Sequence, residues 1–289
     1  MSFFGKITGE SVTLTANAKI NIILSVESKR DDGYHLLDSV FQSVSLGDRL
    51  KLTKSENISI RSNVKELENE ANIAFKAAEL FFGETALKGG VKIKLIKRIP
   101  TAAGGGGGRA DAAAGILGLD RLYGTKLSKE RLMNMALNLG ADVPFFLEGG
   151  TVRASGVGER LERLPDFKEG FFILLKTEAK PSTKEMYDKL DAENPPKPKV
   201  DEFVRELSSG NINNAIRLFD NSFKACWRNS KTEQILKETA DSVSLSGSGP
   251  TWFGFYEDER TAQRAYKKLK KLYKDCFLAR PADKAIIFE

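Results

Sequence analysis

The sequence has 289 residues, of which 41% are hydrophobic and 29% charged, and its formal net charge is +6. This length allows two domains or one large one, and the composition is typical of a soluble globular protein. No apolar run approaches the roughly 18 residues of a membrane-spanning helix, we expect no secretory signal, and a single histidine excludes a His-rich metal site.

The charge and the cysteines bear on partners and location. The densest basic block, residues 264–274, is more typical of a solvated helix face than of a nucleic-acid surface. We therefore expect no nucleic-acid partner and no membrane contact, whereas a mild basic excess suits an enzyme with polyanionic phosphate substrates. Two cysteines without metal-type spacing favour a reducing, cytoplasmic location. A monomer or a weak homodimer is expected.

The N-terminal part of the chain is rich in predicted strands. Apolar and β-branched residues at 12–25 predict one or two strands, broken near Asn17. Lys19 and Asn21 lie among them, and spacing alone favours a solvent-facing, edge-strand position for Lys19. A charged turn follows at 29–35 and ends in Tyr34 and His35. A lone histidine is more often structural than catalytic. Further strands are predicted at 36–45, 48–54 and 58–61.

A glycine-rich stretch comes next, between a strand and a helix. After a predicted helix at 69–82, a strand is predicted at 91–97 and a second helix at 111–122. Five consecutive glycines, 104–108, precede the second helix. Free N–H groups and the helix dipole would point at a ligand in such a loop, so the arrangement favours a phosphate site. A flexible linker is the weaker alternative.

Two well-known phosphate loops fit this stretch poorly. A Walker A loop requires Lys followed by Ser or Thr after the glycines, whereas Arg109 and Ala110 follow here. A dinucleotide fingerprint requires a second strand after the helix. The sequence instead predicts another helix at 129–139, with Ser128 as its N-cap and Gly140 at its end.

Short strands and helices follow to the end of the chain. Asp142 lies in an otherwise apolar turn at 140–146, where an unpaired carboxylate is costly, so it either caps a helix or meets a cation. A second glycine loop is expected at 244–250. Strands are predicted at 151–154, 159–161, 171–176, 252–256 and 285–288, and helices at 182–190, 200–208, 211–218, 231–239 and 260–273.

Four segments, in this order and spacing, resemble the motifs of the GHMP kinases. They are residues 18–21, the glycine stretch 100–114, the segment 140–146 around Asp142, and the loop 245–250. Residues 29–35, 156–159 and 182–187 further resemble members that phosphorylate a cytidine-diphosphate-linked alcohol in non-mevalonate isoprenoid synthesis. The resemblance implies a two-domain α+β fold, divided as 1–160 and 161–289, with the active site in the cleft between the domains.

The same resemblance assigns roles to individual residues. It implies ATP and Mg²⁺ as cofactors, with Asp142 orienting the substrate hydroxyl or accepting its proton and Lys19 paired with Asp142. Tyr34 and Tyr187 would sandwich a cytosine ring, and His35 would contact the polar edge of the base. Asn72, Gly104, Gly105, Gly106, Gly107, Gly108, Arg109 and Ala110 would bind the nucleotide, and Asn21, Thr183, Ser246 and Gly247 the substrate.

The glycine loop departs from the family pattern. Members usually read Gly-Leu-Gly-Gly-Gly-Ser-Ser-Asp, whereas Gly105 replaces the leucine here and Arg109 and Ala110 replace the serines. Serine hydroxyls can contact phosphate or Mg²⁺. Arg109 can bind phosphate, but a helix dipole disfavours a cation at this end. We expect an active kinase with reduced activity.

Two alternatives stay open at this stage. One is a catalytically silent protein of the same fold that still binds the cytidyl substrate. The other is a kinase for another small alcohol, such as homoserine or mevalonate, which would leave Tyr34, His35 and Tyr187 without a purpose.

Overall fold

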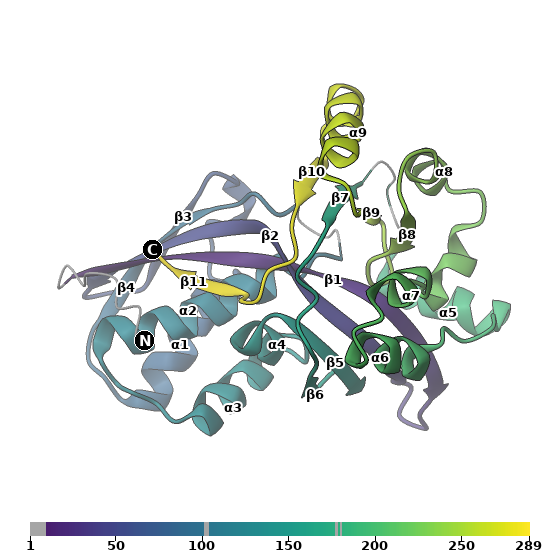
Figure 1. Ribbon diagram of the computed structural model, residues 1–289. Coiled ribbons are helices and arrows are strands. Elements are labelled where there is room, and N and C mark those ends of the chain that lie inside the picture. Colours follow the sequence, from purple (N-terminus) through teal and green to yellow (C-terminus); the bar gives the residue numbers. More distant parts are fainter. Residues whose placement is uncertain (1–9, 101–103, 177–178, 180) are drawn as a thin grey trace.

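The computed structural model describes residues 10–100, 104–176, 179 and 181–289 (Figure 1). Residues 101–103 of the glycine-rich stretch lie outside the described residues. In the part of the chain that is described, no helix combines the length and the apolar character needed to cross a membrane.

Two long antiparallel strands, β1 (Ser11–Lys29) and β2 (His35–Ser55), run through the molecule and are joined by the predicted charged turn (Figure 1). The pairing register shifts between Asn17 and Ala18. The predicted break near Asn17 is therefore a β-bulge inside a continuous strand. The two strands predicted at 36–45 and 48–54 are likewise one strand.

The first sheet has the strand order β11-β1-β2-β4-β3, and β5 pairs with the first half of β2 and with β6. Among the described strand pairs of this sheet, only β3 and β4 run parallel. Helices pack against this sheet (Figure 1) and bury a core that includes Leu14, Leu52 and Phe81. The elements are β3 (Ser59–Ser62), β4 (Gly90–Ile96), β5 (Thr151–Gly156), β6 (Arg160–Arg163), β11 (Ile286–Phe288), the short 3-10 helix η1 (Lys65–Leu67), α1 (Ile73–Thr85), α2 (Gly107–Tyr123), α3 (Lys129–Leu139) and α4 (Val143–Glu148).

The second sheet is antiparallel throughout, with the order β10-β7-β9-β8. Its strands are almost entirely buried, and two further core clusters form around it. The elements are β7 (Phe171–Leu175), β8 (Ser242–Leu245), β9 (Trp252–Tyr256), β10 (Cys276–Ala279), α5 (Thr183–Glu193), α6 (Val200–Ser208), α7 (Ile212–Arg217), the 3-10 helix η2 (Ser222–Trp227), α8 (Lys231–Lys237) and α9 (Glu259–Leu272).

Local chemistry explains where several helices begin. Asn72 accepts a hydrogen bond from the Ala74 N–H (2.9 Å), so α1 starts at Ile73 and not at residue 69 as predicted. Helix α2 begins four residues earlier than predicted, because Gly106 takes the left-handed conformation and serves as its N-cap. The apolar turn at 140–146 contains a helix that was not predicted, α4, with Pro144 in its first turn.

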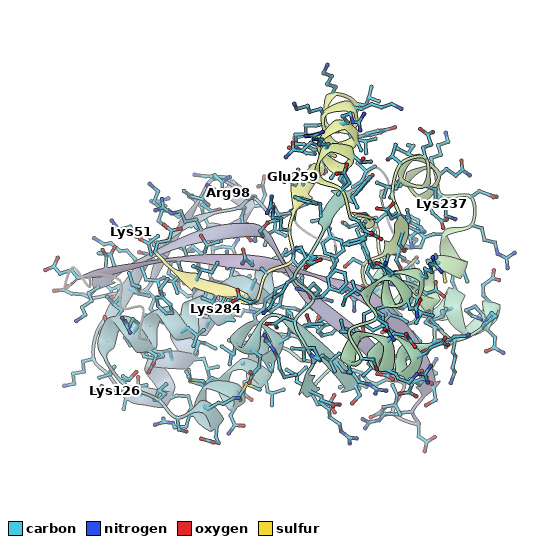
Figure 2. The ribbon with its side chains drawn as sticks, viewed as in Figure 1. Lys51, Arg98, Lys126, Lys237, Glu259 and Lys284 are labelled. Atoms are coloured by element: carbon cyan, nitrogen blue, oxygen red, sulfur yellow. The ribbon has the colours of Figure 1, made fainter. Side chains whose placement is uncertain are left out.

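The expected division of the chain at residue 160 stays a prediction. Strand β6 begins at that residue and pairs with β5 in the first sheet. The C-terminal strand β11 also joins the first sheet, through β1. Exposed lysines such as Lys51, Lys126 and Lys237 lie at separate edges of the molecule, so the positive charge is spread around it (Figure 2).

Candidate active site

A cavity of about 710 Å³ is lined by both halves of the chain. This volume is in the range of small-molecule sites. The N-termini of α1, α2, α4 and α5 contribute to its wall, together with β1 and the loop after β8. The predicted site residues on the wall are Lys19, Asn21, Asn72, Gly104, Gly106, Gly107, Gly108, Arg109, Asp142, Thr183, Tyr187 and Gly247. Tyr34, His35, Gly105, Ala110 and Ser246 do not line it.

The glycine loop brings backbone close to this cavity. Gly106 has φ 67° and Gly104 has φ 79°. A Cβ on Gly106 would lie 2.6 Å from Phe146 Cζ, and one on Gly104 would lie 2.6 Å from the Ser246 carbonyl oxygen, so both positions require glycine. No described side chain caps α2. Its first N–H groups therefore remain available to an anion at the cavity wall.

Hydrogen bonds fix the loop to its neighbours. The Lys19 N–H donates to the Gly105 carbonyl (3.1 Å). Ser246 Oγ donates a hydrogen bond to the Gly104 carbonyl (3.3 Å) and accepts one from the backbone N–H of Asn21 (3.4 Å). Ser246 is fully buried. Ser246 thus holds the glycine loop against β1.

Gly105 and Ala110 face away from the cavity. Gly105 lines a separate hollow of about 20 Å³ with Ile99, Leu174 and Phe277. The Ala110 methyl group is buried in the first core, and its N–H donates to the Gly106 carbonyl (2.9 Å). Of the two residues that replace the family's serines, only Arg109 reaches the cavity.

Lys19 is a buried cation on the cavity wall. Lys19 is only 5% exposed, so the interpretation of Lys19 as a solvent-facing residue of an edge strand is wrong. Its Nζ donates to Asn21 Oδ1 (2.7 Å) and lies 4.3 Å from the centroid of the Phe41 ring. Burial lowers the pKa of Lys19; Asp142 partly opposes this shift, whereas Arg109 adds to it.

Asp142 pairs with Arg109 and not with Lys19. Arg109 Nε lies 3.8 Å from Asp142 Oδ2, and the described residues contain no direct Lys19–Asp142 ion pair. The expected pairing is corrected on this point, because Asn21, two residues along the same strand, takes the Lys19 ammonium. Asp142 is the N-cap residue of α4 but accepts no capping hydrogen bond. Its carboxylate therefore meets a cation, which was one of the two expectations.

The aromatic residues form a stack in which histidine takes an unexpected place. The His35 and Tyr187 rings stack with centroids 4.4 Å apart and an interplanar angle of 18°. Phe223 contacts Tyr187 edge-on. Burial, with a smaller effect of Asp142, raises the pKa of Tyr187 to about 12. Tyr34 is 66% exposed. His35, and not Tyr34, covers one face of Tyr187. The sandwich of a cytosine ring between Tyr34 and Tyr187 stays a prediction.

His35 is held in place by an acidic partner. Its Nε2 lies 2.7 Å from Asp191 Oδ1, and the other oxygen of Asp191 accepts from Lys29 Nζ (2.9 Å). Asn72, expected near the nucleotide, lines the cavity but uses its amide to cap α1 and to donate to the Leu67 carbonyl (2.9 Å). Thr183, at the start of α5, also lines the cavity.

A buried cluster on the cavity wall was not anticipated. Lys97 Nζ donates to Asp111 Oδ2 (2.7 Å) and to Asp48. Burial acts to lower the pKa of Lys97, but Asp111 and Asp48 outweigh it and raise that pKa. Burial raises the pKa of Asp111, and its Oδ1 has no hydrogen-bond partner among the described residues. Lys97 and Asp111 both line the cavity.

The chain is similar to known proteins along most of its length. Residues 72–150 match the family described as GHMP kinases N terminal domain, and residues 229–275 match GHMP kinases C terminal. A 4-diphosphocytidyl-2-C-methyl-D-erythritol kinase from Thermoanaerobacter pseudethanolicus is 38% identical over 285 residues, which covers 96% of this chain and 98% of the relative. The chain belongs to the GHMP kinase family.

Solved GHMP kinases share the architecture. A crystal structure of 4-(cytidine 5'-diphospho)-2C-methyl-D-erythritol kinase is 32% identical, with a TM-score of 0.80 over 93% of this chain and 99% of that one. A homoserine kinase from Cytophaga hutchinsonii, at 16% identity, has a TM-score of 0.76 over the whole of both chains, which shows the common fold. The expected two-domain GHMP kinase fold and membership in a family of small-molecule kinases are confirmed.

Proposed function

We propose that this GHMP kinase transfers the γ-phosphate of ATP to the 2-hydroxyl of 4-diphosphocytidyl-2-C-methyl-D-erythritol, a step of non-mevalonate isoprenoid precursor synthesis. The observation that carries the proposal is similarity, over nearly the full length of both chains, to kinases named for this substrate. The cavity of this chain also joins the glycine loop, Lys19 and Asp142. Homoserine and mevalonate kinases are similar to this chain at 16% identity or less, a level that supports the fold alone.

Different residues of the cavity have different roles in phosphoryl transfer. Asp142 accepts the proton of the substrate hydroxyl, whose oxygen then bonds to the γ-phosphorus while the bond to the β-phosphate oxygen breaks and ADP leaves. Lys19, held by Asn21, supplies positive charge beside the transferred group. The free N–H groups at the start of α2 hold phosphate oxygens.

Asp111 is the side chain that would hold Mg²⁺ together with the phosphates. Mg²⁺ is usually bound through one or two carboxylates and substrate phosphates, and the Oδ1 of Asp111 is buried without a partner in the described chain. When bound, the ion neutralises phosphate charge. Tyr187, Thr183 and Phe223 form the part of the wall that would receive the cytidyl group.

The test is a coupled ATP-consumption assay with 4-diphosphocytidyl-2-C-methyl-D-erythritol, homoserine, mevalonate and galactose in parallel. We expect turnover with the cytidyl alcohol alone. Asp142→Asn should reduce kcat by about 100-fold or more while calorimetry shows unchanged affinity for the cytidyl alcohol. Asp283→Asn is the matched control, because it makes the same change at an exposed carboxylate outside the cavity. Preference for homoserine or mevalonate, or binding without turnover, would favour one of the alternatives.

We also propose a cytoplasmic location and a monomeric or weakly dimeric state. Both cysteines, Cys226 and Cys276, are free thiols, as a reducing compartment favours. Light scattering after size exclusion measures the oligomeric state directly.

A further inference from the structure

Arg109 occupies a position at which the family usually has serine, and its ion pair with Asp142 is weak. It is in the first turn of α2 and lines the cavity, and 54% of its side chain is exposed. Its separation of 3.8 Å from Asp142 is well beyond the 2.7–2.9 Å of a charge-assisted hydrogen bond. A half-exposed pair at this distance is weak. It sits, moreover, at the helix end where the dipole disfavours a cation.

The balance of charges around Arg109 favours the binding of an anion. Lys97 is already neutralised by Asp48 and Asp111. On the other side, Arg109 pairs with the Asp142 carboxylate, and the same carboxylate interacts electrostatically with Lys19. Burial lowers the pKa of Lys19, and the positive charge of Arg109 adds to this shift. This side of the cavity thus holds two cations for one acid. A terminal phosphate would relieve their repulsion, and the planar guanidinium fork suits phosphate better than it suits a distant carboxylate.

We propose that Arg109 exchanges partners during the reaction: it pairs with Asp142 before ATP binds and with the terminal phosphates of ATP once the nucleotide is bound. The exchange frees the Asp142 carboxylate to accept the hydroxyl proton. The inference rests on the proposed kinase function and adds a residue that couples nucleotide binding to release of the base. Arg109 thereby takes over, with different chemistry, a phosphate contact that a serine hydroxyl would make.

The first experiment measures binding and needs no turnover. Calorimetry compares a non-hydrolysable ATP analogue with AMP on the full chain, for the wild type, Arg109→Ala and Arg109→Lys. We expect Arg109→Ala to weaken the analogue at least tenfold and AMP less than twofold, with Arg109→Lys in between because lysine keeps the charge but not the fork. Arg131→Ala is the control, since Arg131 is equally half-exposed but pairs with Glu84, a residue that does not line the cavity.

A double-mutant cycle tests the exchange itself. Asp142→Asn should tighten the ATP analogue several-fold in the wild-type background, because Arg109 then has no partner to give up. In the Arg109→Ala background the gain should be at least threefold smaller, since only the repulsion between Asp142 and phosphate is removed. An equal or larger gain in the Arg109→Ala background overturns the exchange.

The outcomes separate this inference from the proposed function. If the wild type phosphorylates the cytidyl alcohol and Arg109→Ala binds the ATP analogue as tightly as the wild type, only the role of Arg109 is wrong. A higher kcat in Arg109→Ala with unchanged nucleotide affinity would make Arg109 a plain inhibitor of Asp142 and would also overturn the exchange. A wild type that binds no ATP analogue overturns both proposals.

Discussion

Lys97 holds two buried carboxylates together at the cavity wall. Its side chain is 5% exposed, and those of Asp48 and Asp111 are no more exposed. Asp48 also accepts the backbone N–H groups of Arg98 (2.6 Å) and Ile99 (2.9 Å). The cluster therefore ties β2, the end of β4 and the first turns of α2 to one another, so it positions the glycine loop as well as stabilising the core.

Replacing Lys97 with methionine should strongly destabilise the protein. The change keeps the length of the side chain but leaves two buried carboxylates without their cation, so we expect the free energy of unfolding to fall by about 3–5 kcal/mol. Urea denaturation measures this. Lys129→Met, which breaks the exposed pair with Glu148, is the control and should change stability little. An unchanged midpoint for Lys97→Met would mean that the cluster contributes nothing to stability.

Tyr187 should carry the binding of the cytosine base. It lines the cavity, whereas Tyr34 is exposed and is not part of the cavity wall. We expect Tyr187→Ala to weaken CMP binding by about 1–3 kcal/mol, and Tyr187→Phe to retain it, because stacking requires the ring and not the hydroxyl. Calorimetry with CMP measures both. Tyr34→Ala, measured beside them, tests the sandwich: a similar loss requires Tyr34 to close over the bound base.

At the scale of the element, two neighbouring glycines before α2 should respond differently to substitution by alanine. Gly105→Ala should raise the free energy of unfolding by about 0.4–1 kcal/mol, because alanine lowers the conformational entropy of the unfolded chain. The folded protein accepts the methyl group, which would lie 3.4 Å from Ile99 Cγ2 beside the small hollow there. Gly106→Ala should destabilise instead, since its φ is 67° and its Cβ would lie 2.6 Å from Phe146. Thermal unfolding of the two variants compares them directly, and equal shifts would contradict the prediction.

Elements with local signals were predictable, and those fixed by tertiary contacts were not. The helix α3 has the predicted bounds because Ser128 caps it and Gly140 ends it. Strand β10, four residues long, was missed: it follows a basic helix without a turn signal, and its pairing with β7 defines it. The 3-10 helix η2 was missed for the same kind of reason, since tertiary packing of Phe223 and Trp227 accompanies it.

In the site, too, features with a local sequence signal were predictable and features that depend on tertiary contacts were not. The family motifs indicated Lys19, Asp142 and the glycine loop, and the cavity brings them together. The Lys97 cluster joins residues 49 and 14 positions apart, which no local pattern connects. The pairing of Asp142 with Arg109 was likewise hidden, because it depends on how the first turn of α2 faces α4. Sequence thus indicated the residue types of the site but not their partners.

At the scale of the whole molecule, β1 links the cores. Leu14 belongs to the core of the first sheet, Ile20 to the second cluster and Leu24 to the third. The C-terminal strand β11 returns to pair with β1, opposite Leu14 to Ala16. A cut at residue 160 would separate these partners and expose apolar surface on both sides. We therefore expect the two predicted domains to unfold as one cooperative unit.

The two tryptophans make this expectation testable. Trp227 and Trp252 both lie in the third cluster, so their fluorescence reports on the C-terminal half. Leu14→Ala removes side-chain volume from the first core and should cost about 2–5 kcal/mol. If the chain unfolds as one unit, this distant change lowers the midpoint seen by tryptophan fluorescence as much as the midpoint seen by far-UV circular dichroism. Leu24→Ala, in the same cluster as the tryptophans, should lower the fluorescence midpoint under either organisation and so serves as the control. A fluorescence midpoint that Leu14→Ala leaves unchanged would instead establish two domains that unfold independently, because the first core could then be lost while the tryptophan environment stays intact.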